Sequence, residues 1–167
     1  EIEGIHDRGD WDLSNHAKHS GEELKYRDES GREFYPYVIE TSAGADRSLL
    51  VFLLDAFTSV KGGRTTTTES TKEEEFVLKL HKFLAPVRVA VLPLVKNKAD
   101  IVKKAREIFE ALKQHFMAQY DEQGAVGRRY RRQDEIGTPY CVTIDFDTLS
   151  DNAVTVRDRD TMAQERV

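Results

Sequence analysis

The sequence predicts an α/β protein in two parts, one over residues 1–57 and the other over residues 76–167. In both parts, short apolar segments typical of strands alternate with segments of helical period. Between the parts lies 58–75, which holds two glycines, four consecutive threonines and three consecutive glutamates, and almost nothing to bury. We interpret this segment as a flexible linker or insertion at a domain boundary.

Composition limits what the chain can be. Its 167 residues suffice for one ordinary domain or two small ones, and a hydrophobic content of 39% supports a real core. No apolar run is long enough to span a bilayer, so we expect no membrane partner. The single cysteine, Cys141, excludes an internal disulfide and fits a reducing compartment, so the predicted location is cytoplasmic. The start at Glu1 and a helix-like end over 161–167 lead us to expect a piece of a longer protein.

The first part is expected to contain a strand over 1–5, a helix over 13–19, strands over 24–26 and 34–39, and a helix from Arg47 to about Phe57. Asp12 is suited to cap the first helix at its N-terminus, and Gly21 is suited to end it. The polar turn over 28–31 predicts a hairpin. In the last helix, Leu49 to Leu54 leave almost no polar face, which predicts burial.

The second part is predicted to form a mixed sheet flanked by helices. The expected elements are strands over 76–80 and 87–95, a helix within 99–119, a strand over 117–120, a helix over 124–136, and strands over 140–146 and 153–157. Pro93 argues that the second strand leaves the ladder near Leu92. Apolar residues from Ile101 to Phe116 recur at helical spacing, and Gly137 is suited to end the following helix.

The junction after the strand at Glu40 is the first candidate site. Ser42 to Ala45 are small enough for a ligand to lie close to the backbone, and the helix N-terminus behind them offers N–H groups to an anion. Glu40 and Ser42 could present a carboxylate and a hydroxyl to an amine. The alternative is that Glu40 only caps the following turn.

Arg47 follows the small residues of the same junction. Its planar fork of donors could hold a phosphate group. The alternative is an ion pair with Asp46 or Asp55.

Histidine and cysteine give weaker signals. His16 and His19 share a helix face with His6 nearby, but this spacing is weak evidence for a metal and we predict none. Cys141 lies in mid-strand and is interpreted as a small core residue.

Four arginines around one tyrosine form the sharpest charge feature of this acidic chain, whose net charge is -5. The cluster consists of Arg128, Arg129, Tyr130, Arg131 and Arg132. Its arginines would suit phosphates, and Tyr130 could stack on an unpaired base. The alternative is a solvated helix face that Asp134 and Glu135 partly neutralise.

Longer strings of the sequence carry a resemblance. VIETSAGADR, followed by the LLVFLLDAF helix, resembles the third signature motif of class II aminoacyl-tRNA synthetases. The chain is similar to the homodimeric type of glycyl-tRNA synthetases in EIEGIHDRGDWDL, KLHKFLAPVRVAVLPLVKN, GRRYRRQDEIGTPYCVTIDFDTL and TVRDRDTMAQERV. The resemblance implies the C-terminal part of a class II catalytic domain over 1–57, with antiparallel strands and the motif helix. It implies an anticodon-binding domain over 76–167, with its last helix truncated.

The resemblance also implies roles for individual residues. Glu40 and Arg47 would be the catalytic pair, with Arg47 on an ATP phosphate. The implied glycine contacts are Glu40, Thr41, Ser42, Ala43 and Gly44, and the implied ATP contacts are Glu1, Ile2, Gly44, Ala45, Asp46 and Arg47. The tRNA contacts would come from Arg128, Arg129, Tyr130, Arg131 and Arg132. Thr41 departs from the family, in which proline is usual, and leaves that turn less rigid.

The implied reaction joins glycine to ATP as glycyl-adenylate and then transfers glycine to tRNA(Gly). Mg²⁺ and a homodimer are expected for the full enzyme. Because the first two class II motifs do not occur in the sequence, we expect this chain alone not to activate glycine. The alternative function is a non-catalytic, synthetase-like tRNA-binding module or accessory protein.

Overall fold

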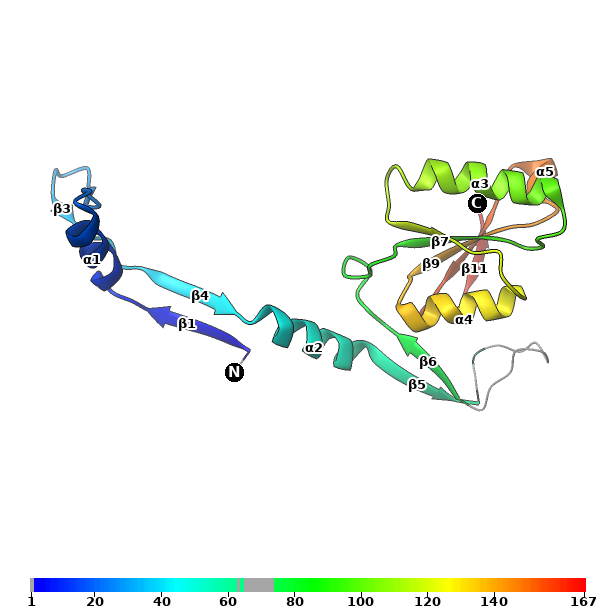
Figure 1. The fold of residues 1–167 in the computed structure, drawn as a ribbon, viewed down its shortest axis with the longest axis horizontal. Helices are drawn as coiled ribbons and strands as arrows, with labels where there is room; N and C mark the ends of the chain where they lie inside the picture. The colour runs from blue at the N-terminus through cyan, green and yellow to red at the C-terminus, as the bar shows by residue number, and fades with distance from the viewer. Residues whose placement is uncertain (1, 63, 65–73) are drawn as a thin grey trace. The chain divides into compact units, whose positions relative to one another are not determined.

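The computed structural model describes residues 2–62, 64 and 74–167 (Figure 1). The chain forms two compact units, Glu1–Val51 and Phe52–Val167. The α/β class predicted from the sequence is confirmed. The domain limits 1–57, 58–75 and 76–167 stay a prediction.

The first unit is built on short antiparallel strand pairs. Its elements are β1 (Glu3–Asp7), α1 (Trp11–Ser20), β2 (Tyr26–Arg27), β3 (Glu33–Phe34), β4 (Ile39–Ala43) and the start of α2 (Ala45–Ala56). β2 and β3 form the predicted hairpin, in whose turn Asp28 Oδ1 accepts the N–H groups of Ser30 and Arg32 at 2.9 Å each. The strand expected over 34–39 is instead divided between β3 and β4, because Pro36 has no N–H to continue a ladder.

α1 ends where the sequence predicts but begins earlier. Gly21 has a φ of 77° and donates its N–H to Ala17 O at 2.9 Å, so it closes the helix as expected. The helix starts at Trp11, so the expectation that Asp12 caps it is wrong. Asp12 lies in the first turn, where its carboxylate binds the Arg8 guanidinium at 2.9 and 3.0 Å.

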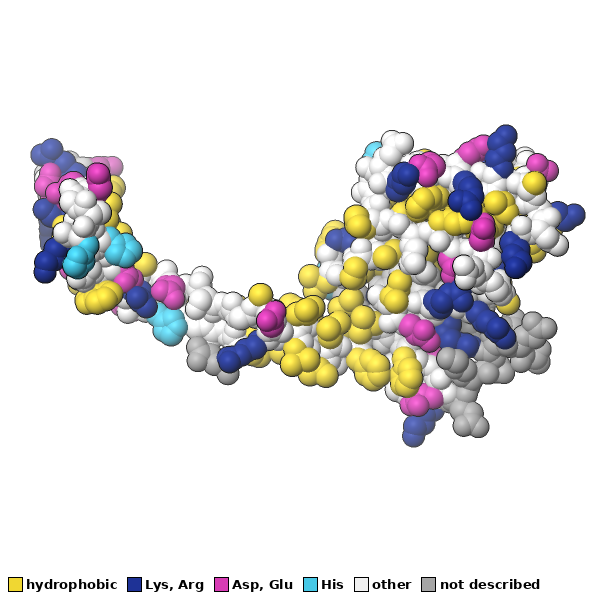
Figure 2. Space-filling view, in the orientation of Figure 1, with side chains coloured by type: hydrophobic (Ala, Val, Ile, Leu, Met, Phe, Trp, Pro, Cys, Tyr) yellow, Lys and Arg dark blue, Asp and Glu magenta, His cyan; other side chains and the backbone are white. Residues whose placement is uncertain are grey.

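α2 is the most apolar of the described helices, yet most of its side chains are exposed. The exposed fractions of Leu49 to Leu54 lie between 37% and 68%. Figure 2 shows hydrophobic side chains in yellow along this helix. The predicted burial is wrong for this chain, because no other element among the described residues covers these side chains. Contiguous exposed apolar surface is typical of an interaction site.

The second unit is organised around a five-stranded mixed sheet. Its elements are β5 (Phe57–Lys61), β6 (Glu74–Leu78), β7 (Val89–Pro93), α3 (Ala99–Leu112), β8 (Ala118–Tyr120), α4 (Val126–Ile136), β9 (Tyr140–Ile144), α5 (Thr148–Asp151), β10 (Thr155–Asp158) and β11 (Gln164–Arg166). The strand order is β11-β10-β9-β7-β8, with β7 parallel to both neighbours and the other pairs antiparallel. α3 and α4 cover opposite faces (Figure 1). The mixed sheet flanked by helices is therefore confirmed.

Alternate residues of the central strands build one core on each face of the sheet. The α3 side contains Val89, Val91, Ile101, Ala105, Val142 and Ile144. The α4 side contains Ala90, Leu92 and Cys141, with Tyr130 of α4 packed against them. Burial raises the pKa of the Cys141 thiol to about 12, which leaves it unsuited to act as a nucleophile at neutral pH.

The C-terminal residues form a strand, so the expectation of a truncated helix over 161–167 is wrong. Asp158 Oδ1 accepts the N–H groups of Asp160 and Thr161 at 2.9 Å and closes a turn. The chain then reverses and pairs with β10 as β11. A strand at this edge satisfies backbone groups that a short isolated helix would leave to solvent.

The predicted linker is regular at both ends. Its first residues belong to β5 and its last two to β6, and the two strands pair antiparallel. The expectation of a flexible loop is wrong there, because Glu75 and Val77 of β6 are buried. Residues 63 and 65–73 lie outside the described residues.

Among the residues described, every helix is too short or too polar to cross a membrane.

Candidate functional site

Glu40 and Ser42 project from the same face of β4, since side chains alternate along a strand. Across the pair with β1, His6 lies opposite Glu40 and Gly4 lies opposite Ser42. Because Gly4 has no side chain, nothing on β1 fills the position opposite Ser42. The structure thus brings the carboxylate and the hydroxyl together on a face that suits a small ligand.

The Glu40 carboxylate already faces one cation. Arg8 Nη1 lies 3.5 Å from Glu40 Oε2, and the Arg8 guanidinium is also held by two hydrogen bonds to Asp12. The Glu40 side chain is 43% exposed, so its carboxylate remains accessible to a ligand cation. Thr41 and Ala43 face the other side of β4 and are not brought together with Glu40 as side chains.

The start of α2 completes this junction. Gly44 O accepts the N–H of Ser48 at 2.9 Å, and Gly44 N–H donates to Ile2 O at 3.3 Å, which places Ile2 beside the helix start. The Arg47 stem lies against Gly44, with Cδ 3.5 Å from where a Cβ would stand. Arg47 therefore sits in the first turn, at the positive end of the helix dipole. Glu1 lies outside the described residues.

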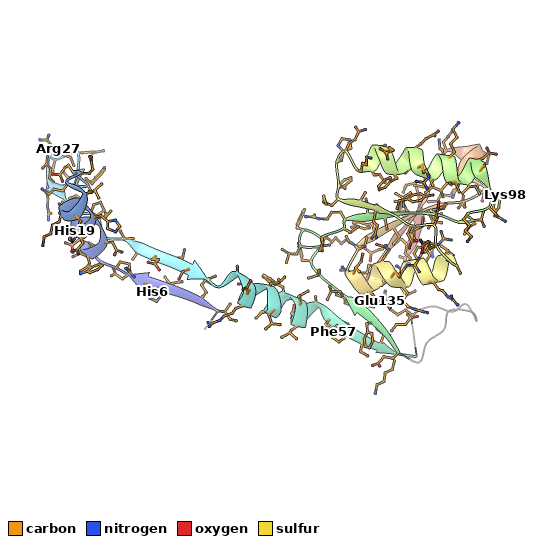
Figure 3. The ribbon with its side chains drawn as sticks, viewed as in Figure 1. His6, His19, Arg27, Phe57, Lys98 and Glu135 are labelled. Carbon is orange, nitrogen blue, oxygen red and sulfur yellow. The ribbon has the colours of Figure 1, made fainter. Side chains whose placement is uncertain are left out.

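The histidines of the first unit do not converge. His6 lies on β1 and His19 on α1 (Figure 3), with His16 also on α1. In the described part of the chain, no three His, Cys, Asp or Glu side chains gather as metal ligands would.

Two arginines of the Arg128 to Arg132 cluster point into the protein. Arg129 is 2% exposed and donates to Pro93 O, to Leu94 O at 3.2 Å and to Gly124 O at 3.0 Å. Arg131 is also buried and binds Glu75 Oε1 through Nε and Nη2, at 3.0 and 2.9 Å. Burial leaves these guanidinium groups no surface for RNA, so their predicted role as direct tRNA contacts is corrected.

Arg128 and Arg132 face outward from α4, because residues four apart share a helix face. Lys and Arg side chains gather over α4 in Figure 2. Arg132 Nη2 lies 2.5 Å from Asp121 Oδ2. Glu135 is exposed, but Asp134 is buried, so the alternative of a wholly solvated face is wrong for that residue. The sequence reasoning treated five consecutive residues as one cluster, although each helical step turns a side chain by about 100°.

Sequence reasoning missed a cavity of about 350 Å³ in the second unit. Its walls come from α4, β9, β10, β11, the β10–β11 turn, the residues just after β7 and β9, and Arg64, which follows β5. They include Arg64, Tyr130, Thr143, Asp145, Arg157 and Gln164. Tyr130 Oη lies 2.5 Å from Thr143 Oγ1, and the Arg157 guanidinium lies 4.8 Å from the Tyr130 ring centroid. No local sequence signal could have found this cavity, because its residues are up to 100 positions apart.

The wall of the cavity combines the Tyr130 ring with hydrogen-bonding groups, and α4 also carries the outward Arg128 and Arg132. Residues 88–167 match the family model described as "Anticodon binding domain". This match covers β7 to β11, and with them every cavity residue except Arg64.

Over its whole length the chain is similar to glycine–tRNA ligases, so the resemblance found in the sequence is confirmed. The ligase of Thermobifida fusca (strain YX) is 55% identical over 168 residues, which cover 100% of this chain and 36% of the relative. The ligase of Nocardia farcinica is 51% identical over 173 residues, with 100% and 35% covered. The ligase of Alkaliphilus metalliredigens is 52% identical over 168 residues, with 100% and 34% covered. The chain thus spans about a third of the length of these relatives.

Among the solved structures that match, one aligns along nearly the whole chain. Giardia lamblia prolyl-tRNA synthetase, in complex with prolyl-adenylate, aligns with a TM-score of 0.64 and 17% identity. The alignment covers 99% of this chain and 32% of that protein. At this identity the likeness shows the fold alone.

Proposed function

We propose that this chain supplies part of the glycine and ATP site, and a tRNA-binding domain, of a glycine–tRNA ligase. In the first step a glycine carboxylate oxygen attacks the α-phosphorus of ATP, which gives glycyl-adenylate and releases pyrophosphate. In the second step a hydroxyl of the terminal tRNA ribose attacks the glycyl carbonyl and releases AMP. The observation that carries the proposal is the identity of 55% over the whole chain, which includes the junction of β4 and α2 where Glu40, Ser42 and Arg47 lie.

The chemistry of this junction fits the two small substrates. Glu40 and Ser42 would hold the glycine ammonium, and the small residues up to Gly44 would exclude any longer side chain. Arg47 and the free N–H groups at the start of α2 would hold an ATP phosphate. The nucleotide is taken as MgATP, with the ion as part of the substrate. These groups act by positioning and charge neutralisation rather than by covalent catalysis.

The proposal extends to partners that follow from likeness to glycyl-tRNA synthetases. These are tRNA(Gly) as the RNA, a homodimer as the assembled enzyme and the cytoplasm as the location. The exposed side chains of α2 support a further part of the proposal, that glycine activation needs polypeptide beyond this chain to cover them.

The test uses the Thermobifida fusca ligase with its 168 matching residues replaced by this chain. We expect this chimera to catalyse glycine-dependent pyrophosphate exchange, and the chain alone to give none. Glu40→Gln in the chimera removes the charge that pairs with the ammonium, so the glycine KM should rise at least tenfold. Glu3→Gln is the matched control, because Glu3 lies opposite Ala43 on the other face of the same strand pair. An unchanged glycine KM in the Glu40 variant would show that Glu40 does not bind the glycine ammonium.

The alternative is a non-catalytic tRNA-binding module. The presence of Glu40, Ser42 and Arg47 together favours the ligase, because a module without chemistry has no use for all three. A chimera that binds tRNA(Gly) but lacks exchange activity would support the module instead.

The tRNA interface is proposed to include the outward face of α4. Arg128→Ala and Arg132→Ala are each expected to weaken binding of a tRNA(Gly) transcript. Each should also lower the slope of log Kd against log salt concentration by about one, the loss expected for one phosphate contact. Kd measured across a series of salt concentrations checks this. Arg106→Ala on α3, across the sheet, is the control and should change neither quantity. Unaltered salt slopes in the α4 variants would mean that this face of α4 is a solvated surface that makes no phosphate contacts.

The cavity beside α4 is proposed to take a nucleotide of the same RNA. Its polar groups, among them Thr155 and Gln164, are suited to hydrogen-bond a base edge, while Tyr130 and Met162 offer apolar contact. Its volume of about 350 Å³ lies within the range of small-ligand pockets.

A further inference from the structure

Arg64 contacts three elements, of which α4 and the turn between β10 and β11 line the cavity. Its side chain is only 8% exposed, and its backbone N–H donates to Glu75 Oε2 of β6 at 2.7 Å. Nη2 donates to Arg159 O and Nε to Met162 Sδ at 3.3 Å, both in the turn between β10 and β11. Nη1 lies 3.6 Å from Asp134 Oδ2 of α4. One residue thus links the hairpin strand β6, the helix α4 and the last turn of the sheet.

The same contacts continue to the cavity wall. Asp134 accepts two hydrogen bonds from Arg157 of β10, at 2.9 and 2.8 Å, and the Arg157 guanidinium packs over the Tyr130 ring. Arg64, Tyr130, Arg157 and Met162 all line the cavity. A shift of Arg64 would therefore displace Met162 directly. Through Asp134 it would also displace Arg157 and, with it, Tyr130.

We propose that Arg64 is a positioning residue of the nucleotide cavity, which sets the place of Arg157, Tyr130 and Met162 without contacting a phosphate. This inference rests on the proposed binding of tRNA by this domain. Two of its side-chain nitrogens donate within the protein, and the third, Nη1, is a buried atom beside Asp134. A buried guanidinium of this kind displaces no counterions from RNA, whereas an exposed one on α4 does. Arg64 lies outside the residues that match the anticodon binding family, so it adds a wall from another part of the chain.

The test measures Kd for a tRNA(Gly) transcript at several salt concentrations, using the whole 167-residue chain. Arg64→Ala is expected to weaken binding about tenfold, equal to the loss of one base-directed contact, with the salt slope unchanged. Arg128→Ala is the comparison variant and should lower the slope by about one. Arg106→Ala is the control and should behave like the unaltered chain. A slope that falls in Arg64→Ala would overturn the proposal, because Arg64 would then contact a phosphate itself.

A double-mutant cycle separates positioning from a general loss of stability. Gln164 lines the cavity from β11, so its contribution depends on how the wall is placed. If Arg64 acts through the cavity, Gln164→Ala should cost clearly less binding in the Arg64→Ala background than in the unaltered chain. Additive losses would show that Arg64 does not act through this site. If the unaltered chain does not bind tRNA, the proposed function is wrong. If the unaltered chain and Arg64→Ala bind tRNA equally well, only the inference about Arg64 is wrong.

Discussion

Asp134→Ala is expected to lower the free energy of unfolding of the second unit by about 3–5 kcal/mol, the usual cost of breaking a buried ion pair from one side. Arg157 is 1% exposed and binds Asp134 through two hydrogen bonds of 2.9 and 2.8 Å. Burial disfavours the charge of Arg157, and the Asp134 carboxylate outweighs this effect, so the pKa of Arg157 is raised. Without the carboxylate, a buried guanidinium has no counter-charge at hydrogen-bond distance.

Urea unfolding, followed by circular dichroism, measures this loss. Glu110→Ala is the matched control, because Glu110 pairs with Lys113 at 2.5 Å on the exposed surface of α3. That pair spans one helical turn and should be worth only ~0.3–0.5 kcal/mol. A cost below about 1 kcal/mol for Asp134→Ala would mean that Arg157 finds water or another acceptor when the carboxylate is gone.

Gly137→Ala is expected to cost about 2–5 kcal/mol of unfolding free energy, for two separate reasons. Gly137 ends α4 with a φ of 83°, and a side chain in this left-handed region costs ~1–2 kcal/mol. A Cβ there would also stand 2.9 Å from Leu78 O and 3.3 Å from Leu80 Cδ1, so β6 or α4 would have to move. Overpacking of this kind typically costs about 1–3 kcal/mol.

Gly124→Ala separates the two contributions. Gly124 has a φ of 73°, but the nearest atom to its added Cβ is Arg128 Cδ at 4.0 Å. This variant should therefore lose only the backbone part, about 1–2 kcal/mol. Equal losses for the two variants in the same urea experiment would show that the contact between α4 and β6 tolerates an extra methyl group.

The elements that the sequence predicted well are those encoded by nearby residues. The apolar spacing from Ile101 onward identified α3, although the helix ends at Leu112, before Phe116. Gly21 and Gly137 ended their helices as expected. Glu40 and Ser42 were paired because they are near neighbours after a predicted strand, whereas β4 runs through both residues and puts them on one face. The fold class could thus be derived from local periodicity, and the proximity of these two residues from their spacing in the chain.

Features that depend on distant partners could not be derived in this way. Arg131 turns inward because Glu75 lies across from it, and Asp134 does so because Arg157 follows 23 residues later. The sequence around α4 contains no trace of either partner. The same holds for Arg64, which occurs in a segment whose composition indicated a loop. Its side chain contacts residues as far away in the sequence as Met162.

The carbonyl oxygens around Arg129 have an electrostatic consequence. The backbone oxygens of Pro93, Leu94 and Gly124 accept hydrogen bonds from Nη1 and Nη2 of the guanidinium, and they are dipoles rather than carboxylates. The carboxylate that acts on the charge of Arg129 belongs to Asp121. Charges held beneath the surface are screened less by salt than exposed ones. Arg129 therefore adds a buried positive charge to the side of the sheet that α4 covers, in a chain with a net charge of -5.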